Sequence, residues 1–115
     1  MTTSTVVAAA LPIAKFSNWT GIKPTTIYFS GDAGNIVMGI TWSSWTASSA
    51  EGQGMWGYED CIPNCAQGHV TDYPTTVKLS AVSGGQFTQL VEIQTGPYAH
   101  TLTYTLPSTF INAAS

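Results

Sequence analysis

The sequence contains no arginine and few charges: only 8% of its residues are charged. Its three lysines, Lys15, Lys23 and Lys78, stand far apart. Proteins that bind nucleic acid neutralise phosphates with clustered basic side chains, so this class of partner is excluded. No apolar run approaches the roughly 18–20 residues that a membrane-spanning helix requires. We therefore expect a weakly charged domain without a membrane span.

Apolar residues do not recur at the 3.6-residue spacing of a helix, but short segments alternate apolar and polar residues at period two, which predicts β-strands. Glycine-rich turns separate these segments, and serine and threonine make up about a quarter of the chain. The predicted strands are residues 15–19, 25–30, 35–45, 69–73, 75–82, 86–95 and 99–106. Six or seven short strands of this kind predict an all-β fold, either an antiparallel β-sandwich or a small barrel.

The same alternation predicts which side chains face the core. In residues 35–45 the inner face is predicted to hold four side chains: Ile36, Met38, Ile40 and Trp42. Trp45 then falls on the opposite face. In residues 86–95 the predicted inner residues are Phe87, Val91 and Ile93, with Leu90 breaking the pattern. Residues 46–57 contain three glycines and no clear alternation, which predicts a long loop or an irregular hairpin arm.

A chain of 115 residues fits a single domain. We place this domain at residues 15–115, after a flexible N-terminal tail of residues 1–14. The tail contains an apolar run, but Lys15 is the first basic residue, so the positive segment that opens a signal peptide is missing. The expectation is a mature secreted domain.

The two cysteines, Cys61 and Cys65, are separated by three residues that include Pro63. An even cysteine count in an arginine-free, threonine-rich chain favours a short-loop disulfide formed in an oxidising compartment. The alternative is a metal pair completed by His69 and His100, although structural zinc sites usually use C-x2-C spacing and four ligands. A calcium loop at residues 31–35 is a further alternative that a hairpin turn explains equally well. We predict the disulfide, no metal and no cofactor.

Residues 41–68 hold three of the four tryptophans and both cysteines. Trp45, Trp56 and Tyr58 are the candidates for an exposed aromatic platform, and Asn64 lies in the adjoining cysteine loop. Aromatic faces stack on sugar rings and dominate protein interfaces, so the predicted partner is an extracellular protein or a glycan. The alternative is that the rings fold back and cover an open face of the sheet.

Candidate catalytic groups are few. His69 and Asp72 lie three residues apart and His100 opens a strand, but no G-x-S-x-G or H-E-x-x-H motif accompanies them. We therefore expect a non-enzymatic binding domain. A small secreted hydrolase or protease inhibitor stays open, as does a self-assembling surface protein, because few charges protect the strand edges from pairing. The oligomeric state is not predicted.

Several motifs together resemble a group of small secreted actinobacterial proteins. They are I-Y-F-S-G-D-A-G-N-I-V at residues 27–37, I-T-W-S-S-W-T at 40–46, A-x-G-x-G at 50–54 and D-C-I-P-N-C-A-Q-G at 60–68, followed by Y-P-T-T-V-K-L-S at 73–80. The resemblance covers roughly residues 24–95. It implies export as a short mature β-domain and brings no catalytic residues with it.

Overall fold

The computed structural model describes residues 11–29, 36–59, 64, 66, 70–108 and 110–115. These residues form nine strands and no helix: β1 (Ala14–Lys15), β2 (Thr20–Gly21), β3 (Thr26–Tyr28), β4 (Ile36–Trp45), β5 (Ala50–Glu59), β6 (Val70–Ser83), β7 (Gln86–Gln94), β8 (Thr101–Thr105) and β9 (Asn112–Ala114). Seven strands make one sheet in the order β8-β7-β6-β5-β4-β3-β9, and β1 pairs with β2. All pairs within the sheet are antiparallel. The predicted all-β class is therefore confirmed.

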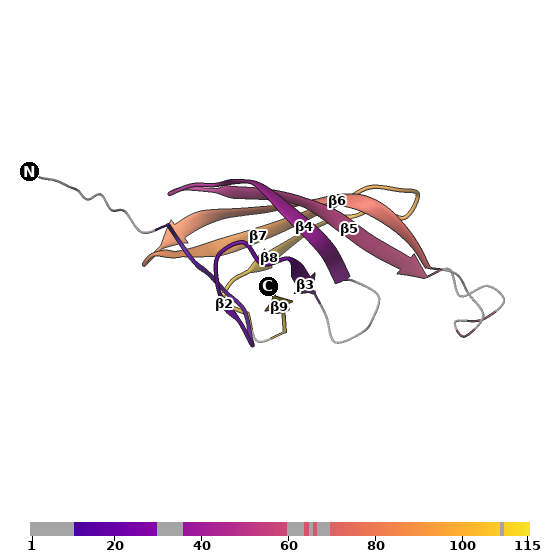
Figure 1. Ribbon diagram of the computed structural model, residues 1–115, viewed down its shortest axis with the longest axis horizontal. Helices are drawn as coiled ribbons and strands as arrows, with labels where there is room; N and C mark the ends of the chain where they lie inside the picture. The colour runs from indigo at the N-terminus through magenta and orange to yellow at the C-terminus, as the bar shows by residue number, and fades with distance from the viewer. Residues whose placement is uncertain (1–10, 30–35, 60–63, 65, 67–69, 109) are drawn as a thin grey trace, which may run out of the picture.

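The sheet curls into a half-barrel, so that it has a concave inner face and a convex outer face (Figure 1). Strands β2, β3 and β9 lie beneath the long central strands. In the described part of the chain, no helix has the length and hydrophobicity needed to cross a membrane.

Strand β4 contains two irregularities that change which side chains face inward. Its register against β5 shifts between residues 38 and 41 and again between residues 42 and 44. Gly39 has a φ of 62°, a conformation that glycine adopts without steric cost and that is common at β-bulges. Each extra residue reverses the alternation of the strand. The inner face of β4 consequently holds Val37, Ile40, Trp42 and Trp45.

This pattern corrects three predictions for β4, because Ile36, Met38 and Trp45 each lie on the face opposite to the one predicted, Ile36 beside outward-facing Tyr28. Met38 was expected in the core, but it directly follows buried Val37 and therefore points to the outer face, where it is 43% exposed. Trp45 was expected opposite Trp42, but the second bulge places both rings on the inner face, with centroids 4.9 Å apart in an edge-to-face contact. Period-two reasoning fails here because bulges depend on the paired strand.

Strand β5 pairs with β4, so of the two alternatives predicted for residues 46–57 the long loop was wrong, and the irregular hairpin arm agrees with the structure from residue 50 onward. Two of its glycines, Gly52 and Gly54, lie at period two on the inner face, where neighbouring atoms leave no room for a Cβ atom. A Cβ at Gly52 would lie 2.8 Å from a ring carbon of Trp42, and one at Gly54 would lie 2.9 Å from Val37. The glycines are therefore spacers for the bulky side chains of β4.

Strand β7 changes face within its first half. Phe87 is completely buried, but the next buried side chain, Leu90, comes three residues later and not two. From Leu90 onward the buried side chains follow at period two, namely Glu92 and Gln94. The change occurs opposite Ala81 on β6, whose φ is 58° and whose carbonyl accepts a hydrogen bond from Thr88 Oγ1. The predicted inward orientation of Val91 and Ile93 was therefore wrong, and the inner face of β7 carries a carboxylate.

Strand β6 passes through Pro74, where the sequence predicted an interruption. Pro74 pairs with Met55 on one side, and its carbonyl accepts a hydrogen bond from the Thr95 amide on the other. Proline has no N–H to return to the Thr95 carbonyl. The indole Nε1 of Trp56 donates to that carbonyl instead, at 3.0 Å, so no acceptor is left unpaired there.

The N-terminal segment crosses the concave face and closes the core. The Ile13 amide donates to the Gly85 carbonyl, and the Ile13 carbonyl accepts from the Phe87 amide. Ala14 and Phe16 are buried beside them. Residues 12–14, which belong to the expected tail, are thus packed in the domain, whereas residues 1–10 lie outside the described residues.

Candidate functional site

Trp45 is one of the predicted binding residues, and its ring lies in the core. The side chain is 7% exposed and makes edge-to-face contacts with Trp42 and with Phe87, the latter at a centroid distance of 5.4 Å. Its Nε1 donates to the Pro12 carbonyl at 2.8 Å. Trp45 therefore fastens the N-terminal segment to the sheet, in agreement with the alternative that the aromatic rings cover a sheet face.

Trp56 has a similar position on β5. It is 5% exposed, and its ring lies 5.9 Å from that of Tyr73. With its Nε1 bonded to the Thr95 carbonyl, both its polar and its apolar atoms have partners inside the protein. These two indoles are not an exposed platform.

Most of the other predicted site residues lie wholly or partly outside the described part of the structure. Tyr58 lies in β5, but its side chain is outside the described part of the structure. Asn64 is exposed. Cys61 and Cys65 also lie outside the described residues, so the disulfide stays a prediction.

The outer face of the sheet carries an apolar patch that the sequence did not predict. It consists of neighbouring side chains on four adjacent strands and is called the outer patch here: Tyr28, Ile36, Met38, Met55 and Pro74. The register places Tyr28 opposite Ile36, Met38 opposite Met55, and Met55 opposite Pro74. Directly opposed residues on antiparallel strands point to the same face, so these side chains form one continuous surface.

Three side chains of the outer patch are more than a third exposed to solvent. Tyr28 is 39% exposed, Met38 43% and Met55 38%. Isolated exposed apolar residues are ordinary, whereas these side chains are contiguous across four strands of one sheet.

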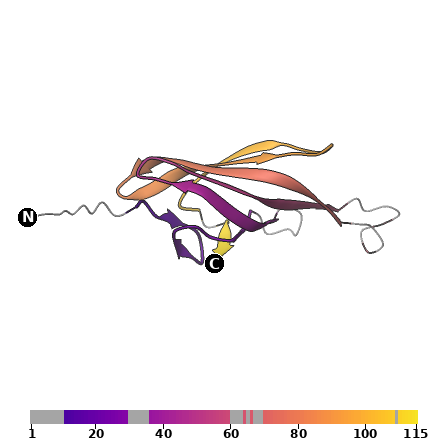
Figure 2. The same ribbon diagram turned by 45° about the horizontal axis from the view of Figure 1, so that its top comes forward.

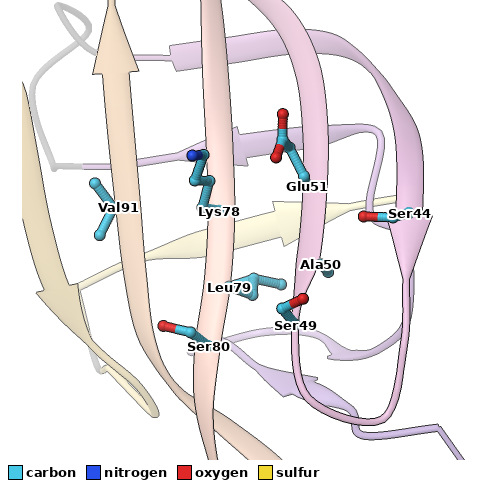
Figure 3. A pocket seen from close by; sticks show the side chains of 8 residues that line it. All are labelled: Ser44, Ser49, Ala50, Glu51, Lys78, Leu79, Ser80 and Val91. Carbon is cyan, nitrogen blue, oxygen red and sulfur yellow. The ribbon is translucent and has the colours of Figure 1, made fainter.

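A second feature of the outer face is a shallow polar depression of about 350 Å³ (Figure 3). It is called the serine depression here, and its lining residues are Ser44, Ser49, Ala50, Glu51, Lys78, Leu79, Ser80 and Val91. The register aligns Ser44, Glu51, Lys78 and Val91 across four strands. Hydroxyl groups, one carboxylate and one ammonium group thus surround a single hollow.

Glu51 and Lys78 face each other across the pair of strands β5 and β6 and rise from the sheet in Figure 3. The carboxylate of Glu51 accepts a hydrogen bond from Gln53 Nε2 at 3.3 Å. A donor and an acceptor of opposite charge beside serine hydroxyls can bind a polyhydroxylated ligand by hydrogen bonds.

The inner face contains the most deeply buried ionisable group among the described residues, Glu92. Its side chain is 0% exposed, and its Oε2 accepts a hydrogen bond from Gln94 Nε2 at 3.2 Å. Gln94 in turn accepts a hydrogen bond from the His100 amide. Because Glu92 is enclosed, it belongs to the internal hydrogen-bond network of β7 and β8 and does not contact solvent.

The candidate catalytic and metal-binding residues are not brought together in the part of the chain that is described. His100 is exposed directly before β8, and Asp72 is exposed on β6. His69 lies outside the described residues. Among the described side chains, no three of the types His, Cys, Asp and Glu gather in a way that could hold a metal ion.

The outer patch escaped sequence analysis because Ile36 and Met38 were assigned to the core. One signal was available: Met55 alternates with Gly54 and Trp56 and must therefore point away from the inner face if residues 50–59 form a strand.

Comparison with protein families, with curated protein sequences and with solved structures gave no match for this chain.

Proposed function

We propose that this chain is a non-enzymatic binding domain that docks onto a protein partner through the outer patch. The observation that carries the proposal is the continuity of Tyr28, Ile36, Met38, Met55 and Pro74 on the convex face, with three of these side chains more than a third exposed. Export and the Cys61–Cys65 disulfide are part of the proposal and rest on composition and on the resemblance described above.

The physical basis is burial of apolar surface by a preformed site. Removing apolar surface from water is favourable by roughly 25 cal/mol per Å². The methionines Met38 and Met55 are unbranched and polarisable, so they adapt to the shape of a partner. Because the patch lies on strands of one sheet, little conformational entropy is lost when a partner binds.

The location of the patch fits the region predicted to bind. Met55 belongs to the glycine-rich stretch of β5, and this strand leads into the cysteine loop that contains Asn64. A partner on the outer patch would therefore lie close to where β5 ends. The binding region expected at residues 45–64 is kept, with outward-facing Met55 replacing the buried indoles as its centre.

The test uses a pair of matched double variants. Met38→Asp with Met55→Asp places two carboxylates at opposed positions of the patch, and Thr41→Asp with Gln53→Asp does the same one row away. The proteins are immobilised and incubated with extracellular proteins of the source organism, and bound proteins are quantified by mass spectrometry. Each patch-dependent protein is then purified and titrated.

We expect the patch variant to lower the affinity of the genuine partner by roughly tenfold or more, as for hot-spot substitutions, and the control to retain it. Equal binding of every captured protein to both variants would refute the outer patch as the docking surface. Circular dichroism of both variants verifies that they are folded.

A second candidate function is supported by the serine depression, which offers hydrogen-bonding groups suited to a neutral glycan. Serine hydroxyls pair with sugar hydroxyls, and Glu51 and Lys78 supply charge-assisted bonds. In this case Lys78→Met and Glu51→Gln should each abolish binding in calorimetric titrations with purified cell-wall polysaccharides. Retention of the heat signal in both variants would remove the depression from consideration.

A further inference from the structure

Strand β8 ends the sheet. Within the described part of the chain β7 is its one partner, so its outer edge is available for pairing. The Gln94 amide donates to the His100 carbonyl, and the Leu106 amide donates to the Thr88 carbonyl. In an antiparallel ladder alternate residues turn both backbone groups to the same neighbour, so the even-numbered residues of β8 face β7. The N–H and C=O groups of Thr101, Thr103 and Thr105 consequently point to the free edge.

The opposite edge of the sheet is protected. Strand β9 is only three residues long. The Ser17 amide donates to the Ile111 carbonyl, and Asn18 Oδ1 accepts from the Ala113 amide at 2.9 Å. Figure 2 shows β8 along the upper rim of the sheet and β9 far below it, beside the N-terminal segment. Among the described residues, therefore, the β8 edge alone combines length with backbone groups that have no neighbouring strand.

The sequence of β8, T-L-T-Y-T, is symmetric in residue type about Thr103. If two copies paired antiparallel about this residue, Thr103 would face Thr103 and Thr101 would face Thr105. Both are hydrogen-bonded positions, because these residues carry the outward backbone groups. Leu102 would face Tyr104 on the inner side. Thr–Thr and aromatic–aliphatic pairs are favourable cross-strand neighbours.

We propose that the β8 edge is a self-association site at which a second copy of this chain pairs antiparallel about Thr103. The paired sheets form one continuous sheet across a two-fold axis. The strand contains no charge, so the usual protection against edge pairing is missing. Because the same edge is used on both copies and the β9 edge is capped, assembly stops at a dimer.

The test compares two variants at Thr103 with a control. Thr103→Pro removes one outward N–H and leaves the ladder to β7 intact, because this amide does not face β7. Thr103→Lys places two like charges opposite each other at the two-fold axis. Thr41→Lys adds the same charge on the exposed outer face of β4, away from the edge. The full chain is studied by sedimentation velocity from micromolar to millimolar concentration.

We expect a monomer–dimer equilibrium whose dissociation constant rises at least tenfold in both Thr103 variants and is unchanged in Thr41→Lys. Amide hydrogen exchange supplies a second readout: the Thr103 amide should become protected only as dimer forms. A chain that stays monomeric at millimolar concentration, forms larger assemblies, or dimerises with a rapidly exchanging Thr103 amide would overturn the proposal. If Thr103→Pro fails to fold, Thr103→Lys decides.

Discussion

The two faces of the same sheet use their large side chains in opposite ways. On the inner face three indoles donate to backbone carbonyls of distant segments: Trp42 to Pro24 at 2.7 Å, Trp45 to Pro12 at 2.8 Å and Trp56 to Thr95 at 3.0 Å. On the outer face Met38 and Met55 have no such anchoring and stay more than a third exposed.

The difference shows why an abundance of tryptophan is a poor guide to the binding surface of this chain. A buried indole combines a large apolar area with one donor that must be satisfied, so it suits the closure of a half-open sheet over irregular segments. Less conspicuous residues, namely methionine, serine and threonine, form the outer surface. The predictions below test this division, beginning with the largest effect.

The first prediction concerns Trp45. Replacing it by Ala should destabilise the protein by about 3–5 kcal/mol, because a large cavity forms beneath Trp42 and Phe87 and the N-terminal segment loses its anchor. Urea denaturation followed by circular dichroism measures the loss. A change below about 1 kcal/mol, typical of surface positions, would show that the ring is not a core residue.

The second prediction concerns the spacer glycines. Gly52→Ala should cost about 1–3 kcal/mol, because the new methyl group would lie 2.8 Å from Ile40 and Trp42. The neighbouring outward position provides the control, and Gln53→Ala should stay within about 0.5 kcal/mol of the wild type. Similar losses for both variants would contradict the assignment of inner and outer positions on β5.

The third prediction isolates the indole hydrogen bond. Trp42→Phe keeps an aromatic ring but removes the donor to the Pro24 carbonyl, which should cost about 1–3 kcal/mol if that carbonyl is left unpaired. Thermal denaturation monitored in the far ultraviolet gives the change. An unaltered melting temperature would mean that solvent replaces the indole N–H without cost.

The smallest effect is expected on the outer face. Met38→Ser should change the free energy of unfolding by no more than about 0.5 kcal/mol, since the side chain is 43% exposed. The same substitution should nevertheless weaken partner binding. Its effect on binding should therefore exceed its effect on stability, which is the reverse of what we expect for Trp45→Ala. Chemical denaturation of both variants side by side tests this, and a Met38→Ser loss approaching that of Trp45→Ala would end the distinction between the faces.

Part of the fold follows from local pattern. The alternation of T-L-T-Y-T in β8 is sufficient to separate half-buried Leu102 and Tyr104 from the exposed threonines. Val77 and Leu79 alternate with polar residues on β6 in the same way, and both are buried. These strands are regular, so period-two alternation is sufficient to assign their faces.

Candidate site prediction was weaker. Trp56 has the residue type of an interface anchor, but residue type does not state on which face of a sheet it lies. Assignment of Met55 to the surface required knowing that residues 50–59 form a strand, and Gly52 and Gly54 suggested the opposite. The outer patch also joins β3, β4, β5 and β6, whose alignment is set by pairing between strands distant in sequence.

The sequence by itself determined the all-β class, the glycine turns and the weak charge, because alternation, turn chemistry and composition act locally. Tertiary structure decided which face each side chain occupies in β4 and β7. The bulge at Gly39 reverses the alternation of β4, and the change of face in β7 lies opposite Ala81, whose backbone is left-handed. It also decided that Trp42 and Trp45 lie on the inner face, because the curled sheet brings residues 11–24 across that face, where the carbonyls of Pro24 and Pro12 accept their hydrogen bonds.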